Sequence, residues 1–171
     1  MSCRGIYFAI TDEDAKRLLA ADGDEAVIYF IHEEIEERWN EEWLQPTDKA
    51  WDAIHRCLTD GSLRCKGKSP LEKVVLGGKQ LYRGSDYIVS YLAPNEVRDM
   101  ADLLRGITKD WFRQKYFRLG KRFLGLFRSS SYEGPIGDVD FEYSWSYFEE
   151  TRQIFEKAFS AGRSVIFTVD Q

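Results

Sequence analysis

Three short runs of β-branched and aromatic residues, one near each end of the chain and one in its middle, constrain the fold more than any other feature. They span residues 4–10, 86–92 and 164–169. Runs of this length and composition are typical of β-strands. Because the segments between them carry helical patterns, the sequence predicts a helix-rich α+β domain. Its one small sheet, mixed or antiparallel, is formed by the terminal and central strands.

The helices are predicted from capping residues and from the spacing of apolar side chains. Thr11 and Thr108 stand where a hydroxyl can accept a hydrogen bond from the first turn of a helix. The segment Ser69-Pro70-Leu71-Glu72 has the pattern of a capping box, and Gly77-Gly78 closes the helix that it begins. The predicted helices cover residues 12–21, 24–43, 46–58, 70–76, 94–105, 109–119 and most of the segment between 138 and 162.

The chain is expected to form a single domain over residues 1–171, because no internal repeat or low-complexity tract divides it. No apolar run approaches the roughly 18 residues that a membrane span needs, and the first residues lack the pattern of a signal peptide. Three cysteines without a CxxC spacing indicate neither a disulfide framework nor a zinc site. We therefore expect a cytoplasmic protein with no bound metal, no cofactor and no membrane partner.

The charges are divided into three blocks along the chain. Residues 1–60 carry a net charge of −9, residues 61–128 a net charge of +9, and residues 129–171 a net charge of −5. A total of −5 therefore hides a basic middle between two acidic flanks. The blocks either neutralise one another inside the fold or display charge to a partner.

The acidic flank includes one predicted helix with two different faces. Large apolar side chains recur at Ile28, Ile31, Ile35, Trp39 and Trp43, which predicts one buried stripe. The remaining positions hold a set of glutamates: Glu33, Glu34, Glu36, Glu37, Glu41 and Glu42. These form either a solvated face or an acidic docking surface.

The basic middle includes a segment, residues 109–128, in which basic and aromatic residues alternate. Such a mixture suits nucleic acid, through phosphate contacts and base stacking, or an anionic membrane surface. The sequence pI of about 5.2 opposes both at long range. We expect the aromatic residues to be core and the basic side chains to meet acids of this chain or of a protein partner. The candidate interaction surface is Arg113, Lys115, Arg118, Lys121 and Arg122.

A second candidate site is a pocket around Trp51, His55 and Thr59. Trp51, Ile54, His55 and Leu58 share one face of a predicted helix. An imidazole on an apolar face can have a shifted pKa that serves acid–base chemistry. The alternative is a buried neutral histidine that donates one hydrogen bond to a carbonyl or hydroxyl. No nucleophile elbow is present, and Gly77-Gly78-Lys79 follows a helix, where the dipole repels phosphate.

Several blocks of the sequence resemble a known family. They are WDAIHRCLT at 51–59, SPL at 69–71 with VVLGG at 74–78, YLAPNEV at 91–97, and the terminal segments 5–10 and 155–169. In order and spacing they resemble the YfbM-like family of bacterial proteins of unknown function, domain-of-unknown-function family 1877. Asp60 departs from the pattern, since it precedes the glycine that usually follows the Leu-Thr pair. The resemblance implies a compact cytosolic α+β domain and assigns no catalytic residue.

These observations favour a non-enzymatic cytosolic domain that binds another protein through its segregated charges. Neutralisation of a toxin and control of an enzyme are two forms that such recognition can take. The alternative is an enzyme or small-molecule binder that uses the pocket around Trp51, His55 and Thr59. The two differ in structure, because a binding module displays charge on an open face, whereas an enzyme gathers polar groups in a cleft.

Overall fold

The computed structural model describes residues 3–67, 69–120, 122–123, 127–128 and 132–170, and for 122–123 and 127–128 it describes the backbone only. The elements in chain order are β1 (Gly5–Ile10), α1 (Asp12–Ala20), α2 (Asp24–Phe30), η1 (Ile31–Glu36), β2 (Leu44–Asp48), α3 (Ala50–Leu58), η2 (Pro70–Val74), β3 (Lys79–Gln80), β4 (Tyr87–Leu92), α4 (Pro94–Arg105), α5 (Lys109–Leu119), β5 (Arg122–Phe123), β6 (Phe127–Arg128), α6 (Asp138–Ser160) and β7 (Ser164–Asp170). Of the two η elements, η1 is a π-helix and η2 a 3-10 helix.

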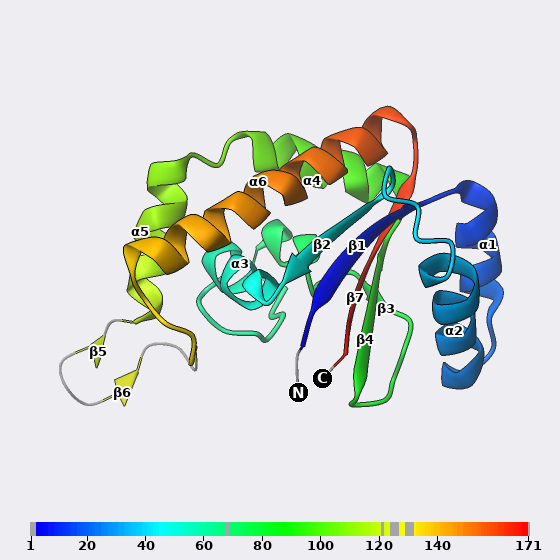
Figure 1. Ribbon diagram of the computed structural model, residues 1–171, viewed down its shortest axis with the longest axis horizontal. Coiled ribbons are helices and arrows are strands. Elements are labelled where there is room, and N and C mark those ends of the chain that lie inside the picture. Colours follow the sequence, from blue (N-terminus) through cyan, green and yellow to red (C-terminus); the bar gives the residue numbers. More distant parts are fainter. Residues whose placement is uncertain (1–2, 68, 121, 124–126, 129–131, 171) are drawn as a thin grey trace.

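The first and last strands lie side by side in the middle of one antiparallel sheet (Figure 1). The strand order is β2-β1-β7-β4-β3, and every neighbouring pair is antiparallel. In the central pair Gly5 lies opposite Val169 and Ile10 opposite Ser164. The predicted fold class is therefore confirmed: a helix-rich α+β domain with a sheet formed by terminal and central strands. In the chain, β5 and β6 follow α5 and precede α6, and they form a separate two-stranded sheet.

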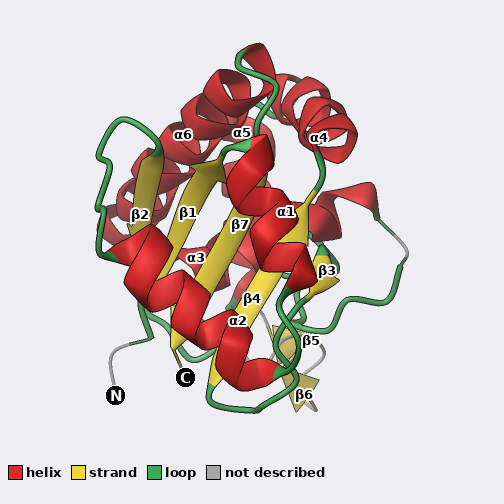
Figure 2. Cartoon of the chain, turned by 90° about the vertical axis from the view of Figure 1, so that its right-hand side faces the viewer, coloured by secondary structure: helices red, strands yellow, loops and turns green. Residues whose placement is uncertain are grey.

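Helices cover both faces of the sheet and make three layers (Figure 2). One face carries α1, α2 and η1, and the other carries α3, α4, α5 and α6. Side chains alternate along β1 as a strand requires. Phe8 and Ile10 enter the core beneath α1 and α2, whereas Tyr7 and Ala9 enter the core beneath α3 and α6.

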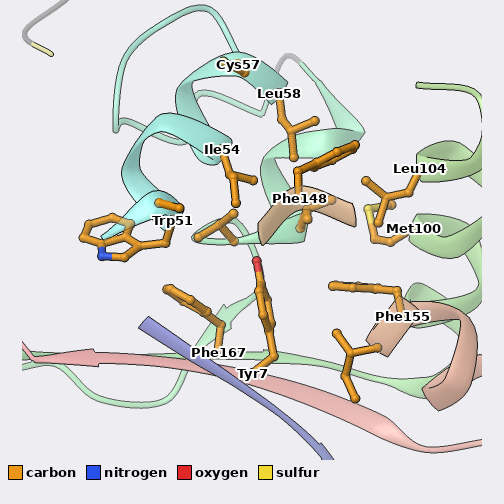
Figure 3. Packing of buried hydrophobic residues seen from close by; sticks show 14 of the residues in the cluster. Tyr7, Trp51, Ile54, Cys57, Leu58, Met100, Leu104, Phe148, Phe155 and Phe167 are labelled. Atoms are coloured by element: carbon orange, nitrogen blue, oxygen red, sulfur yellow. The ribbon is translucent and has the colours of Figure 1, made fainter. Parts of the chain in front are cut away.

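The larger core is rich in aromatic side chains (Figure 3). The Tyr7 ring lies 5.7 Å from that of Phe155 and 4.8 Å from that of Phe167, between centroids. The Tyr7 hydroxyl points from the sheet toward α3 and has no hydrogen-bond partner within the described part of the chain. On the α3 side, Trp51 and Ile54 close this core.

The predicted helix over residues 24–43 is wrong beyond Glu36. The chain leaves α2 as the π-helix η1, turns at Trp39, whose φ is +35°, and enters β2. The amide of Ala9 donates to the carbonyl of Trp43 at 2.8 Å, which extends the pairing of β1 beyond β2. Of the predicted stripe, Ile31 and Ile35 are buried, whereas Trp39 is exposed, so the apolar spacing does not mark a continuous α-helix.

One other predicted helix start also needs correction. Pro46 lies inside β2 opposite Ile6, and the helix expected from residue 46 begins at Ala50. Pairing with β1 decides this, because the Thr47 hydroxyl donates to the carbonyl of Gly5 at 2.8 Å.

Ser69 caps a short 3-10 helix and not the predicted α-helix. Its hydroxyl accepts from the amide of Leu71 at 3.2 Å, and Pro70 occupies the first helical position. The carboxylate of Glu72 accepts from the amide of Gly67 at 2.7 Å, so it ties the preceding loop to this turn. The predicted caps Thr11 and Thr108 are confirmed, since each hydroxyl accepts a hydrogen bond from the first turn of its helix.

Candidate functional site

The three side chains of the predicted pocket lie in the core. Trp51 is 6% exposed, His55 0% and Thr59 7%. The Trp51 indole donates to the carbonyl of Cys3 at 3.0 Å, and the Thr59 hydroxyl donates to the carbonyl of Ser62 at 3.2 Å. Both groups therefore serve local structure, and the imidazole between them has no route to solvent.

His55 also lacks the hydrogen bond expected of a buried histidine. Among the described residues neither Nδ1 nor Nε2 has a partner. Burial lowers the pKa of His55 to about 4, against the opposing effect of the Glu72 carboxylate. The imidazole is therefore neutral at physiological pH.

The basic segment on α5 meets acids of α6. Arg113 forms an ion pair with Asp138. Its guanidinium also lies over the rings of Phe117 and Phe141. The Lys109 ammonium lies 2.6 Å from the Glu142 carboxylate. The middle and last charge blocks thus neutralise each other in part across this helix pair.

The other members of the predicted basic surface differ in their surroundings. The Lys115 ammonium lies 5.2 Å from the Trp111 ring, and Arg118 is exposed on the last turn of α5. Lys121 lies outside the described residues, and only the backbone of Arg122 is described, in β5. Three of the five predicted residues, Arg113, Lys115 and Arg118, therefore share α5, and the side chains of the other two lie outside the described part of the chain.

The first charge block remains concentrated in one layer. The segment from Asp12 to Glu42, which comprises α1, α2, η1 and the turn after it, contains twelve acids and three bases, a net charge of −9. We call this segment the acidic layer. It packs on one face of the sheet (Figure 2). The rest of residues 1–60 is neutral, so this layer holds all the excess charge of the block.

Every base of the acidic layer is paired within the layer. Lys16 lies 2.6 Å from Asp12, Arg17 lies 2.8 Å from Glu34, and Arg38 lies 3.0 Å from Asp14. Burial alone would raise the pKa of Asp14, but hydrogen bonds from Arg38 and Thr11 hold it below its usual value. The acids that make no ion pair with lysine or arginine of the described chain are Glu13, Asp22, Asp24, Glu25, Glu33, Glu36, Glu37 and Glu41.

Two aromatic side chains are exposed on the acidic layer. Tyr29 is 67% exposed and Trp39 is 46% exposed. Trp39 has a positive φ, which is an outlier for a bulky residue and often marks a functional position. It follows a π-helix, another feature that is frequent at functional sites.

A cavity of about 480 Å³ opens beside Trp39, between η1 and the ends of β1, β4 and β7. We call it the η1 cavity. Its lining residues are Arg4, Ile6, Ile28, His32, Glu36, Trp39, Tyr82, Asp86, Tyr87, Thr168 and Asp170. Burial is the main cause that raises the pKa of Tyr87 above its ordinary value, and the Tyr87 hydroxyl donates to Glu36 at 2.8 Å.

A second cavity, of about 580 Å³, is bordered by α3, α5, α6 and the segment 132–135. We call it the α3 cavity. Asp52 and Arg56 form its charged wall as an ion pair, and burial raises the pKa of Asp52. Tyr116 and Tyr143 contribute rings. No group of three histidine, cysteine or carboxylate side chains in the described ranges is placed to hold a metal ion.

Sequence reasoning found the glutamates of the acidic layer but missed Trp39 as a surface residue. It placed Trp39 on the buried stripe, because the spacing of the apolar residues resembles that of a helix. The η1 cavity was also missed, since its walls come from α2, η1, β1, β4 and β7, which are spread along the chain.

The fold and this surface define a helix-rich, three-layer α+β domain with one strongly acidic helical layer. In the described part of the chain no helix has the length and apolarity that crossing a membrane requires. The model of a family described as a domain of unknown function, DUF1877, matches residues 1–168. The chain therefore belongs to this family, as its sequence blocks predict.

A solved structure has the same fold. It is the crystal structure of YfbM from Escherichia coli, a protein of unknown function, which superposes with a TM-score of 0.68 at 17% sequence identity. The match covers 97% of this chain and 99% of that one. A comparison with curated proteins gave no match. The similarity establishes the fold.

Proposed function

We propose that this protein is a non-enzymatic binding domain whose acidic layer recognises a positively charged surface of another protein. The observation that carries the proposal is the net charge of −9 on one helical layer that also exposes Tyr29 and Trp39. Aromatic side chains supply much of the binding energy at protein interfaces, and complementary charge raises the association rate. Neutralising a toxin and controlling an enzyme both fit this kind of recognition.

A protein partner fits the charges better than nucleic acid does. The acidic layer has the same sign as a phosphate backbone, and the basic side chains Lys109 and Arg113 are engaged by acids of α6. Polyanion binding therefore has to overcome repulsion on one face and break ion pairs on the other. We expect no submicromolar binding to duplex or single-stranded oligonucleotides at about 0.15 M ionic strength.

Site-specific photocrosslinking in cells tests the proposal. A photoreactive amino acid at Tyr29, which is 67% exposed on α2, samples the acidic layer, and the same group at Val139, which is 82% exposed on α6, is the matched control. We expect a discrete crosslinked protein from position 29 and not from position 139. Equal crosslinking from both positions contradicts the proposal.

Binding of the crosslinked partner is then measured with purified proteins. We expect Tyr29→Ala to weaken its binding about tenfold, because truncating a central aromatic residue typically costs more than 1 kcal/mol. Leu103→Ala, at a position that is 41% exposed on α4, serves as the control and should bind normally. Raising the salt concentration should slow association more than it speeds dissociation. Insensitivity to both Tyr29→Ala and salt contradicts recognition through the acidic layer.

The α3 cavity supports a second candidate function, small-molecule binding. It is larger than the η1 cavity, and tyrosine rings line it together with the Asp52–Arg56 ion pair. This combination of apolar lining with a few polar groups is typical of ligand pockets. A thermal-shift screen of small molecules tests it, with Tyr143→Ala expected to abolish any stabilisation by a ligand that occupies the cavity.

A further inference from the structure

The η1 cavity has the lining that a long side chain with a charged tip requires. Ile6 and Ile28 supply aliphatic surface, and Trp39, Tyr82 and Tyr87 supply aromatic rings. The rings of Tyr82 and Tyr87 meet edge to face, with centroids 6.3 Å apart. Aliphatic stems of lysine and arginine pack on such apolar surface while their charged ends stay hydrated or paired.

Three carboxylates border the same cavity, and their bonded partners are neutral groups. Glu36 accepts from the Tyr87 hydroxyl at 2.8 Å, and Asp86 accepts from the Tyr82 hydroxyl at 2.6 Å. Asp170 accepts from the backbone amide of Arg4 at 3.4 Å.

Two basic residues, Arg4 and His32, also line the cavity. The guanidinium of Arg4 pairs with Asp48, at 3.3 Å, instead of with a carboxylate of the cavity. His32 Nε2 lies 3.8 Å from Glu36 and carries charge only when protonated. Within the described chain, the three carboxylates therefore make no ion pair with lysine or arginine.

We infer that the η1 cavity binds an arginine side chain of the positively charged protein partner. The inference rests on the proposed function and adds to it the residue that anchors the partner. Arginine fits better than lysine, because a planar guanidinium stacks on aromatic rings and donates two parallel hydrogen bonds to a carboxylate. Trp39, which is 46% exposed, is the most exposed of the three aromatic rings that line the cavity.

Titration of the purified protein with capped amino acids tests the inference without the partner. The probes are Nα-acetyl-arginine methylamide, the equivalent lysine compound, and the equivalent citrulline compound, which is neutral and nearly the same shape as arginine. Chemical-shift changes of backbone amides and of tryptophan indole groups report where each probe binds. We expect the arginine compound to bind at η1 and the citrulline compound to bind at least about tenfold more weakly, because it lacks the charge.

Two conservative variants and one control locate the binding site. Glu36→Gln keeps an acceptor for the Tyr87 hydroxyl but removes a charge, and we expect it to weaken binding of the arginine compound about fivefold. Asp86→Asn provides the same test in the loop before β4 if the first variant does not fold. Glu13→Gln removes an exposed acid of α1 that does not line the cavity, and it should bind the arginine compound normally.

Several results overturn the inference. Equal binding of the arginine and citrulline compounds shows that charge is not recognised, and an equal effect of Glu13→Gln and Glu36→Gln shows only general attraction. Much tighter binding of free arginine than of the capped compound indicates a metabolite in place of a partner side chain. The proposed function is tested separately, by crosslinking from position 29. If the cavity does not bind the arginine compound, only the further inference is contradicted, and recognition by the acidic layer is not.

Discussion

For His55 the sequence predicts the burial of the side chain correctly but not its hydrogen bonding. The i, i+3, i+4, i+7 pattern of Trp51, Ile54, His55 and Leu58 predicts that the imidazole faces the core, and the side chain is indeed 0% exposed. The expected hydrogen bond is not found among the described residues. It could not be predicted, because a partner has to come from elements that pack on α3 and are remote in sequence.

This environment makes stability depend on pH. The pKa of His55 is about 4 in the folded protein, whereas an unfolded histidine titrates near its ordinary value of 6.5. The unfolded state therefore binds more protons between these values, so the contribution of His55 is full above pH 6.5 and is lost as pH falls toward 4. The loss amounts to roughly 3 kcal/mol. Urea unfolding at a series of pH values measures it.

His55→Leu provides the matched comparison. The variant removes the titrating group and two unpaired buried nitrogens while keeping apolar volume, so we expect equal or higher stability at pH 7 and a flatter profile between pH 4 and 6.5. An unchanged pH profile, or a loss of several kcal/mol at neutral pH, would show that His55 is charged or well partnered in the folded state.

At the scale of elements, the regular parts of the chain were predictable and the irregular ones were not. Strands β1, β4 and β7 and helices α1, α4, α5 and α6 follow local patterns of capping and apolar spacing. The segment from Ile31 to Trp43 does not follow such a pattern. Its apolar residues are four apart, a spacing that does not stay on one face of an α-helix. Steps of four residues drift by about 40° each on an α-helix, since a turn takes 3.6 residues. A continuous α-helix would therefore turn Trp39 away from the face that buries Ile31, and the chain instead leaves η1 and turns at Trp39.

The turn after η2 depends on a close approach that only glycine permits. A Cβ at Gly77 would lie 2.6 Å from the carbonyl carbon and oxygen of Glu72, whose oxygen accepts the Gly77 amide at 2.7 Å. We expect Gly77→Ala to cost about 1–3 kcal/mol, because backbone has to shift. At Gly106 the nearest atom would be 3.5 Å away, so Gly106→Ala should be neutral or slightly stabilising. Thermal melts of both variants measure the difference, and equal losses contradict this account of Gly77.

At the scale of the whole molecule, the three charge blocks differ in how far they are neutralised by one another. The middle and last blocks meet across α4, α5 and α6, as in the pair of Arg105 with Glu156. The first block keeps its excess charge in the acidic layer. The sequence shows the blocks but not their arrangement, because the order of charge along the chain does not reveal which helices become neighbours.

Mutual repulsion within the acidic layer should limit stability. Glu33 and Glu37 are exposed, four residues apart, and make no ion pair with lysine or arginine in the described ranges. Replacing both by glutamine should raise the Tm by about 1–2 °C at low salt, with the gain lost near 1 M salt. Glu142→Gln on α6 removes the partner of Lys109 and should bring no gain. A salt-independent gain contradicts an electrostatic origin.

The adjacency of β1 and β7 sets the order in which the protein can assemble during synthesis. β7 is the last strand in the chain, yet it provides the partner for both β1 and β4. While a ribosome is still adding residues before 164, these two strands have unpaired edges, which are prone to associate with other chains. The sheet is therefore completed only when β7 emerges, and a nascent chain that stalls before it is the form most exposed to aggregation.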